Sequence, residues 1–462
     1  MLNIFRLRVH KIMNGARPLN FQRLCSMVTE AYACHDEWAK RLETPVFVGL
    51  DANSFIPELR KRFQGNKVGS AIDLDVAVNC ARNEEELNVL RSLIYKIRHT
   101  KAAASVLPST QHAFIRACLS LGLDEMLMTV LGDPINFGIF PDPFVANLAM
   151  DHFIRKGNMA DASQIASSMM VQEEFRPSVC WMSVLSSLKW LGQKERKPWV
   201  LRKPEEAPAD DDEEVIFRVP YLKNCIFDEH FDLTDPCMLL GKTMAWMCPH
   251  LPTGLGVRSA HLWGLRLFNK KESFKAELNL ILASDDPRLC AALMELVSSP
   301  MLTSSSDSKE TATETPSDAD DWSDVKELLH KTKADAFIDT SIEEAFTEEM
   351  NSAWPQLEAE DIAEQSKLFA VWNQHRVTLV KNKIRRHQLE QRLAEIEEQK
   401  KKFLEEEDLL FFFENKTKWE QAAQLQSSDE QVKEGKQELP SDDKYKVPEL
   451  EKRGTTVRIE RY

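Results

Sequence analysis

Apolar residues recur at helical spacing through most of this 462-residue chain. Between residues 84 and 98 they fall at every third or fourth position and share one helical face, at Leu87, Leu90, Leu93, Ile94 and Ile97. The same pattern returns in residues 215–299 and again in residues 323–352. The sequence therefore predicts an all-α protein.

Three prolines mark a repeated unit in the first half of the chain. Pro108, Pro141 and Pro177 are 33 and 36 residues apart, and a glycine follows each of them, at Gly122, Gly157 and Gly192. Proline stops or opens a helix, and glycine supplies the positive φ at which many helices end. Each unit therefore predicts a helix, a turn, a second helix and a loop, which is typical of a helical-hairpin solenoid.

Polar segments divide the chain into predicted domains. We expect the solenoid over residues 30–201, with an irregular start in which Pro45 and Pro57 break helices. The remaining predicted segments are an acidic linker at 202–214, further helical hairpins at 215–300, a disordered linker at 301–322, helices at 323–415 and a disordered tail at 416–462.

A long helix is predicted near the C-terminus, because residues 360–414 contain neither proline nor glycine. Leu389, Leu393, Ile396, Phe403 and Leu410 follow the spacing of a heptad seam, which makes this helix prone to form a coiled coil. Charged residues, Lys400 and Glu407, occupy the skipped seam positions. A homodimer through residues 389–410 is therefore conceivable but not favoured.

The first 29 residues have the composition of a targeting segment. They contain five basic residues and no acidic one, and Glu30 is the first acid of the chain. Apolar side chains interleave with the basic ones, as in the amphipathic helix of a mitochondrial transit peptide. We predict such a peptide for residues 1–29; the alternative is a basic helix that belongs to the fold.

The charge and cysteine content limit the classes of function. The net charge of −14 combines +6 over residues 1–203 with −20 over residues 204–462. A protein that binds nucleic acid mainly through its phosphates would be more basic, so we do not expect that mode of binding to dominate here. The nine cysteines form no CxxC pair, which predicts buried thiols in a reducing compartment and no metal site. No run of apolar residues is long enough to span a membrane.

No motif in the chain predicts catalysis or a cofactor. Gly241-Lys242-Thr243 ends like a phosphate-binding loop, but Pro236 stands where that motif requires a glycine, so a plain helix is the better interpretation. His250 and His261, near Cys248, lack the spacing of zinc ligands. We expect no enzyme activity.

Two groups of basic residues are candidates for contact with RNA phosphates. One group lies on the long predicted helix and comprises Lys381, Lys383, Arg385 and Arg386, followed by His387 and Arg392. A weaker group comprises Arg98, Arg155 and Lys156. The alternative for both groups is a solvated surface.

The middle unit, residues 138–172, resembles the pentatricopeptide-repeat family. It has that family's Gly-Ile-x-Pro-Asp pattern and a following helix with an Asn-Leu pair. In that family one base is read per repeat, by a side chain early in the first helix and another at the end of the repeat. The resemblance makes Asn147 the first reader and Ser178 the second.

The corresponding position in the flanking units is occupied by Phe114 and Ser183, and phenylalanine cannot hydrogen-bond to a base edge. Two base contacts contribute at most about 6 kcal/mol, whereas nanomolar binding needs about 12 kcal/mol. One good repeat therefore cannot act as an autonomous reader of sequence. The alternative for Asn147 is local capping or packing.

A longer match runs through Phe137–Phe144 and continues through Asn147–Leu148 and Phe153–Lys156, with Tyr95–His99 and Ile115–Cys118 at matching distances upstream. It resembles a family of pentatricopeptide-repeat proteins of the mitochondrial ribosomal small subunit, the family numbered twenty-seven in that subunit's naming series. The resemblance implies a structural, RNA-associated component of the mitochondrial ribosome, located in the matrix.

Its partners would be the small-subunit ribosomal RNA and neighbouring ribosomal proteins. Two other functions stay open. One is a non-ribosomal mitochondrial RNA-maturation or translation factor, and the other is a protein-binding helical scaffold.

Overall fold

The computed structural model describes residues 28–64, 69–199, 201, 230–231, 233–284, 287–298, 322–331 and 337–433. Nearly all of the predicted transit peptide, the acidic linker 202–214, the linker residues 301–321 and the tail beyond 433 lie outside these residues. Within the described part, the regular secondary structure is helical apart from two strands of two residues each. The prediction of an all-α fold is confirmed.

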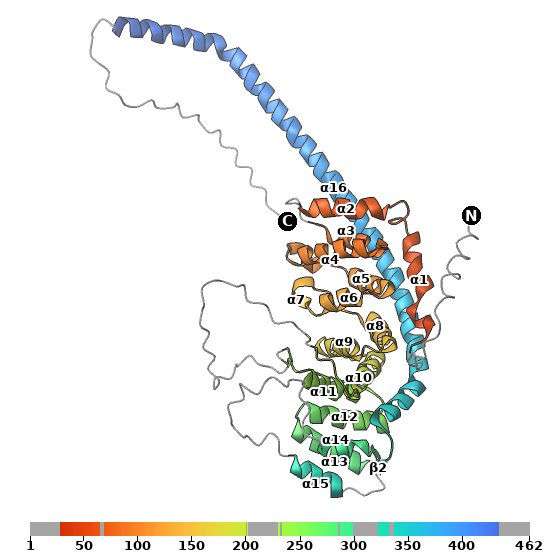
Figure 1. Ribbon diagram of the computed structural model, residues 1–462. Helices are drawn as coiled ribbons and strands as arrows, with labels where there is room; N and C mark the ends of the chain where they lie inside the picture. Colours follow the sequence, from red (N-terminus) through yellow and green to blue (C-terminus); the bar gives the residue numbers. More distant parts are fainter. Residues whose placement is uncertain are drawn as a thin grey trace, which may run out of the picture. The chain divides into compact units, whose positions relative to one another are not determined.

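The elements follow one another in two groups (Figure 1). The first group comprises η1 (Glu30–Ala33), α1 (His35–Ala39), η2 (Lys40–Glu43), α2 (Ala52–Gln64), α3 (Ala71–Cys80), α4 (Glu84–Arg98), η3 (Lys101–Ser105), α5 (Pro108–Leu121), α6 (Asp124–Leu131), α7 (Pro134–Phe137), α8 (Pro143–Lys156), α9 (Met159–Val171) and α10 (Pro177–Leu191). The second group comprises α11 (Pro236–Met247), η4 (Cys248–His250), α12 (Leu255–Leu267), α13 (Lys271–Ala283), β1 (Leu289–Cys290), α14 (Ala292–Ser298), α15 (Ser323–Lys331), β2 (Phe337–Ile338) and α16 (Ile342–Lys433).

Successive helices stack as hairpins from α2 to α15 (Figure 1), and one apolar core runs through the stack. Phe153 of α8, Met169 of α9 and Leu188 of α10 are buried in this core. Each fully buried apolar side chain of this size contributes about 1.5–3 kcal/mol to folding. The core therefore depends on contacts between neighbouring hairpins, as expected for a solenoid.

Two of the marker prolines begin helices, as predicted. Pro108 opens α5 and Pro177 opens α10, each as the first helical residue. In the middle unit the helix starts two residues after Pro141, at Pro143, where the Asp142 carboxylate accepts a hydrogen bond from Val145 N at 2.8 Å. Asp142 is thus the N-cap of α8.

The predicted glycine ends hold at two of three positions. Gly122 has a φ of 70° and Gly157 a φ of 76°, and both end their helices in the left-handed conformation. Gly192 does not, because α10 ends in a right-handed turn with a φ of −73° at this residue. The Gly192 N–H instead donates to Leu188 O at 2.9 Å.

Two prolines lie inside helices rather than at their ends. Pro57 was expected to break a helix, but it lies within α2, where Ile56 and Leu59 beside it are buried. Pro355 lies within α16, next to the buried Trp354. A helix continues past a proline when packing of the adjacent residues offsets the missing hydrogen bond.

α16 also starts earlier and ends later than predicted. It is one helix from Ile342 to Lys433, so it joins segments expected to be separate and includes part of the tail predicted from residue 416. Its first part runs beside α1 and along one side of the stacked helices (Figure 1). β1 pairs with β2 in parallel just before α16 begins.

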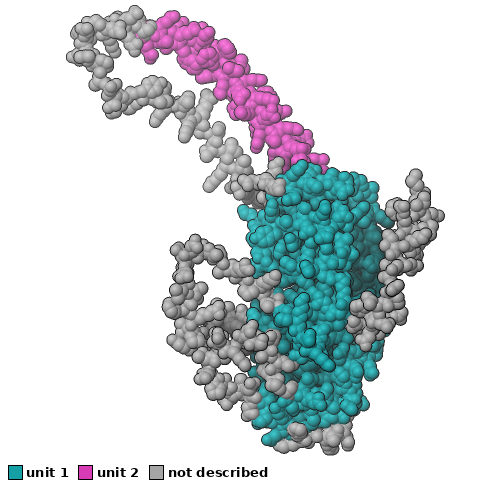
Figure 2. Space-filling model, viewed as in Figure 1, with its two compact units in different colours: residues 1–381 teal, residues 382–462 magenta. Residues whose placement is uncertain are grey.

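The chain divides into two compact units, residues 1–381 and residues 382–462 (Figure 2). The first unit contains the stacked helices and the start of α16. The described part of the second unit is the continuation of α16, and its seam residues Leu389, Leu393, Ile396, Phe403 and Leu410 are exposed.

The Gly241-Lys242-Thr243 sequence is helical, as the sequence indicated, because it lies inside α11. A methyl group at Gly241 would lie 2.6 Å from Leu267 Cβ and 2.7 Å from Phe268 N, so glycine here permits close packing of α11 on α12. Lys242 is buried, with Nζ 3.0 Å from His230 Nδ1. The lysine therefore faces the core.

We expect Gly241→Ala to lower the free energy of unfolding by about 1–3 kcal/mol, because the added methyl must push α12 away from α11. Urea unfolding followed by circular dichroism measures this change. Leu280→Ala, on the exposed side of α13, is the control and should change stability by less than about 0.5 kcal/mol. Equal effects of the two substitutions would argue against close packing at Gly241.

Candidate nucleic-acid interface

Asn147, the predicted base reader, lies on α8 and is completely buried. Its Nδ2 donates a hydrogen bond to Tyr32 Oη at 3.0 Å, and Tyr32 stacks on Phe144 with ring centroids 4.5 Å apart. Asn147 Oδ1 has no hydrogen-bond donor among the described residues. The amide is therefore covered by the chain's own N-terminal segment.

Ser178, the second predicted reader, belongs to the same network. Tyr32 Oη donates to Asp361 Oδ2 at 2.9 Å, and the Ser178 hydroxyl also hydrogen-bonds to Asp361. Burial raises the pKa of Asp361, although both hydrogen bonds oppose this shift. Burial and the nearby Asp361 carboxyl raise the pKa of Tyr32 well above its usual value.

The flanking reader positions are also interior. Phe114 of α5 and Ser183 of α10 are fully buried, and Ser183 Oγ lies 3.8 Å from Met150 Sδ. All four positions inherited from the repeat resemblance therefore face protein in this structure. Contact of Asn147 or Ser178 with RNA stays a prediction, and it would require Tyr32 and Asp361 to move away.

The first part of α16 covers this side of the hairpins from α12 to α3. Near its start, both carboxylate oxygens of Glu349 accept hydrogen bonds from the backbone of α12, from Gly256 N at 2.8 Å and Val257 N at 3.1 Å. Phe346 packs on Trp181 of α10. Further along, Phe369 and Trp372 pack on His112 of α5.

His112 links α5 to α8 beneath this helix. Its Nδ1 lies 2.6 Å from Asp142 Oδ2. Burial alone would raise the pKa of Asp142, but His112 and the backbone amides of Val145 and Phe144 hold it below the usual value. The Pro-Asp pair of the repeat thus serves to cap α8 and to anchor α5.

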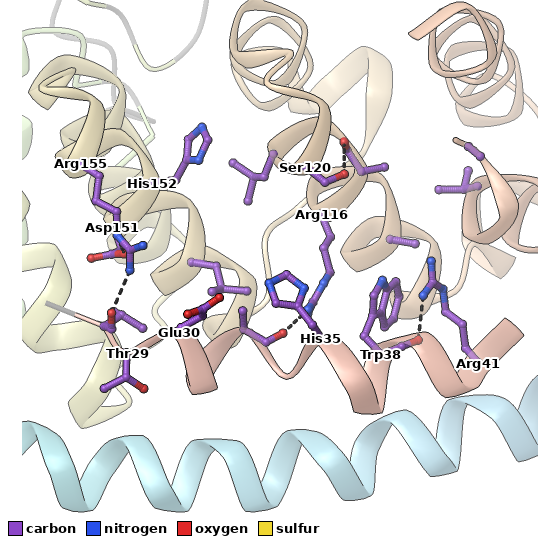
Figure 3. Close-up of a pocket in the computed structure, with 18 residues that line it drawn as sticks. Thr29, Glu30, His35, Trp38, Arg41, Arg116, Ser120, Asp151, His152 and Arg155 are labelled. Atoms are coloured by element: carbon purple, nitrogen blue, oxygen red, sulfur yellow. Dashed lines mark hydrogen bonds and ion pairs between the residues drawn. The ribbon is translucent and has the colours of Figure 1, made fainter. Parts of the chain in front are cut away.

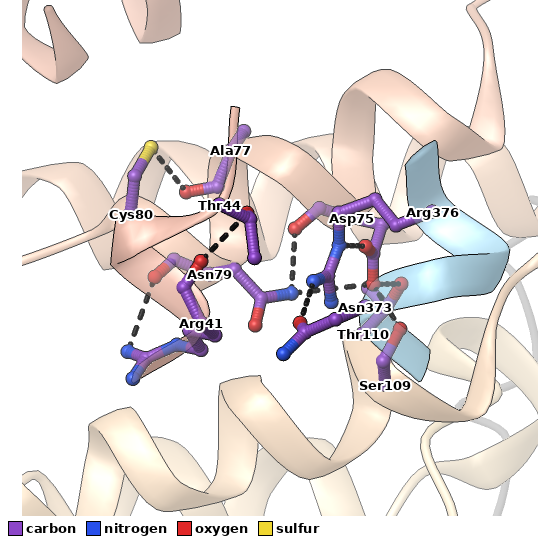
Figure 4. Close-up of polar contacts among 10 residues, drawn as sticks. All are labelled: Arg41, Thr44, Asp75, Ala77, Asn79, Cys80, Ser109, Thr110, Asn373 and Arg376. Atoms are coloured by element: carbon purple, nitrogen blue, oxygen red, sulfur yellow. Dashed lines mark hydrogen bonds and ion pairs between the residues drawn. The ribbon is translucent and has the colours of Figure 1, made fainter. Parts of the chain in front are cut away.

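The side of the hairpins that the first part of α16 covers, from α12 to α3, is called the covered groove. A buried ion pair closes its α3 end (Figure 4). Arg376 Nε of α16 lies 2.6 Å from Asp75 Oδ2 of α3, and the side chains are 2% and 0% exposed. The other Asp75 oxygen accepts hydrogen bonds from Thr110 at 2.9 Å, Asn79 at 3.2 Å and Ser109. Both carboxylate oxygens are therefore satisfied.

The weaker basic group is exposed, but each member has another contact. Arg98 Nε donates to Ile135 O at 2.9 Å. Arg155 Nε lies 2.5 Å from Asp151 Oδ2, and Lys156 Nζ lies 2.6 Å from Asp124 Oδ2. The Lys156 pair is partly exposed and therefore weak, whereas Arg155 pairs with a buried carboxylate and Arg98 bonds to a backbone carbonyl, so each side chain would have to give up an existing contact to bind a phosphate.

The basic group on α16 is different. Lys381, Arg385 and Arg386 are exposed and form no ion pair within the described part of the chain. Lys383, the fourth member, is half-buried and has a further interaction. Lys381 ends the first unit and the other three begin the second. Lys381, Arg385 and Arg386 thus place three unpaired positive charges on a short stretch of α16.

Other candidate chemistry is missing from the described residues. They contain no cluster of three metal-ligating side chains and no helix long and apolar enough to cross a bilayer. The cysteines among them are free and buried, and burial raises the pKa of both Cys118 and Cys180 to about 12. Cys25 and Cys225 lie outside the described residues.

Three residues that organise the covered groove were not identified from the sequence: Tyr32, Asp361 and Arg376. A signal exists for the helix itself, since Phe346, Met350 and Trp354 repeat every four residues. Nothing in the sequence indicates which surface this stripe covers. The residues that α16 contacts are far from it in the sequence; Asp75 and Arg376, for example, are 301 positions apart.

A comparison with protein families identifies the family to which this chain belongs. The family model of mitochondrial 28S ribosomal protein S27 matches residues 4–402, which is most of the chain. This match includes the hairpins, the first part of α16 and the basic group that follows it. The chain therefore belongs to the mitochondrial 28S ribosomal protein S27 family, whose role is structural and not enzymatic, within the ribosomal small subunit of the mitochondrial matrix.

Proposed function

We propose that this protein holds small-subunit RNA and neighbouring ribosomal proteins through its outer surfaces and not by reading bases in the repeat groove. The supporting observation is the hydrogen-bond network that joins Asn147 and Ser178 to Tyr32 and Asp361. A base would have to replace a network that is already made. Breaking it would leave buried polar groups without partners, which costs about 1–3 kcal/mol for each group.

The RNA contacts are assigned first to the basic group on α16, which comprises Lys381, Lys383, Arg385 and Arg386. Lys381, Arg385 and Arg386 form no ion pair within the described residues, so they can neutralise phosphates without first breaking one. Arg98, Arg155 and Lys156 are secondary contacts in this proposal, because each must exchange an existing partner. A ribosomal protein gains affinity from many simultaneous weak contacts, so no single strong site is needed.

The protein contacts are assigned to the second unit. Residues 409–413 are Leu-Leu-Phe-Phe-Phe, and all five side chains are exposed. Consecutive helical residues point about 100° apart, so this segment is apolar on every face. A two-stranded coiled coil buries only one seam, which argues against a homodimer through 389–410. The acidic residues 405–408 just before it favour a basic neighbour with an apolar groove.

The RNA assignment can be tested with the triple variant K381Q/R385Q/R386Q. We expect ultraviolet crosslinking of the full chain to ribosomal RNA to fall several-fold, because three phosphate contacts are lost. The control is K401Q/K402Q, since both lysines pair with glutamates on the same helix. Asn147→Ala should leave the RNA crosslinks unchanged. Loss of one crosslinked nucleotide in Asn147→Ala alone would instead support base reading.

The two alternative functions considered from the sequence predict different sedimentation. A separate RNA-maturation or translation factor would stay at the top of a gradient of mitochondrial lysate while small subunits sediment normally. A protein-binding scaffold would sediment with its partners but would give no RNA crosslinks. We expect the protein to move with the small subunit and to crosslink to RNA.

A further inference from the structure

A pocket of about 580 Å³ lies between segment 28–41 and helices α5 and α8, on the side of the segment that faces away from α16 (Figure 3). The segment forms one wall, and α5 and α8 contribute the opposite one. Its volume is within the range of about 300–1,000 Å³ that is usual for small-ligand sites. This pocket is separate from the groove that α16 covers, and neither the basic group on α16 nor the predicted base readers line it.

Two arginines in this pocket lie near the indole of Trp38. The guanidinium carbon is 3.9 Å from the ring centroid for Arg41 and 5.2 Å for Arg116. Figure 3 shows both side chains on either side of Trp38, Arg41 from η2 and Arg116 from α5. Arginine stacked on an aromatic ring keeps its N–H edge available for an anion.

Neither arginine forms an ion pair with a described carboxylate. Arg41 donates to Trp38 O at 2.7 Å and to Asn79 O at 3.2 Å, and Arg116 donates to Ala33 O. Arg41 Nε and Arg116 Nη1 are buried without any hydrogen-bond acceptor. Arg116 is only 7% exposed, so its positive charge is held in the wall of the pocket with part of its hydrogen-bonding capacity unused.

The surrounding charges offset this pair only in part, because Asp142 attracts Arg116 but forms no ion pair with it in the described part of the chain. Asp151 lines the pocket but lies 2.5 Å from Arg155, and Glu30 is exposed. Burial lowers the pKa of Arg41 to about 9, with repulsion from Arg116 and Arg376 adding to the shift. Burial also lowers the pKa of Arg116 to about 10. Two largely desolvated cations that repel each other across Trp38 are costly, and a bound anion would offset that cost.

We propose that this pocket binds a phosphate group, and that this phosphate is carried by RNA. The inference rests on the proposed function for its RNA source. Guanidinium groups match the geometry of phosphate oxygens and can donate two hydrogen bonds to one phosphate. The indole of Trp38 excludes water from one side, which strengthens these charge-assisted bonds.

The test uses the full chain and two probes, an oligouridylate and inorganic phosphate. We expect Arg116→Gln to weaken oligouridylate binding by about tenfold, the effect of losing one or two charge-assisted hydrogen bonds. The slope of log affinity against log salt should fall by about one. Inorganic phosphate should raise the melting temperature of the wild-type chain but not that of Arg116→Gln.

Lys40→Gln is the matched control, because Lys40 is exposed beside Arg41 and pairs with Glu37 at 2.6 Å. It should bind both probes like the wild-type chain. If circular dichroism shows that Arg116→Gln does not fold, Arg41→Gln provides the same test from the other wall. If Arg116→Gln loses phosphate binding but keeps the oligouridylate affinity of the wild-type chain, RNA is not the source of the phosphate.

Wild-type affinity of Arg116→Gln and Arg41→Gln for both probes would overturn the phosphate site. If K381Q/R385Q/R386Q loses RNA in the same experiment, the proposed function stands without this inference. Competition by a polyglutamate peptide but not by phosphate would assign the pocket to a carboxylate ligand and would also overturn the proposal.

Discussion

Replacing Arg376 with methionine is expected to lower the free energy of unfolding by about 3–5 kcal/mol. The substitution keeps an unbranched side chain of similar length but removes the only cation that contacts Asp75 Oδ2 among the described residues. A buried carboxylate would then stand without its counter-charge at the point where α16 meets α3. Urea unfolding of the full chain, followed by circular dichroism, measures the loss.

The matched control is Arg385→Met, which makes the same change at an exposed position of the same helix and should alter stability by less than about 0.5 kcal/mol. Asp75→Asn in the Arg376→Met background should restore part of the loss. The asparagine oxygen can still accept from Ser109 and Thr110, and no charge is left buried. A double variant that is less stable than the sum of both single changes would contradict this explanation.

The local elements of this fold could be predicted because their signals lie in neighbouring residues. Pro108 and Pro177 begin helices through their fixed φ, and Gly122 and Gly157 end them through a positive φ. Pro57 and Pro355 show the limit of such signals. Tertiary packing of the adjacent side chains decides whether a proline ends a helix, and that packing is not visible in a local window.

The candidate site was harder to predict, because a polar residue at a reader position fits two roles. Asn147 can hydrogen-bond to a base edge or to Tyr32, and the residue type is the same for both. The partner that decides between them is 115 residues away in the sequence. Tyr32 and Asp361 sit in segments outside the repeats, so the repeat resemblance carries no information about them.

The covering helix illustrates the same limit at larger scale. The heptad seam that begins at Leu389 lies on the exposed part of α16, whereas the buried apolar stripe of α16 lies earlier, from Phe346 to Phe369. Both stripes have helical spacing. Only the structure shows which stripe packs on the hairpins and which is exposed.

Phe346→Ala tests whether the start of α16 holds the covered groove together. Phe346 is 0% exposed and packs on Trp181 with ring centroids 4.8 Å apart, and the backbone at Phe346 lies against Gly256 of α12. Truncation removes the ring and leaves a cavity between α16, α10 and α12, which should cost about 3–5 kcal/mol. Hydrogen exchange should also become faster in α16 residues 342–381, since their packing on the hairpins is weakened.

The matched control is Phe403→Ala, the same truncation on the same helix at a side chain that is 66% exposed. It should leave both urea unfolding and exchange in residues 342–381 unchanged, because no cavity forms. A large loss of stability without faster exchange in α16 would place the effect of Phe346 in the hairpins alone. Faster exchange together with new RNA crosslinks near Asn147 would instead show that α16 competes with RNA for the groove, and so would favour base reading.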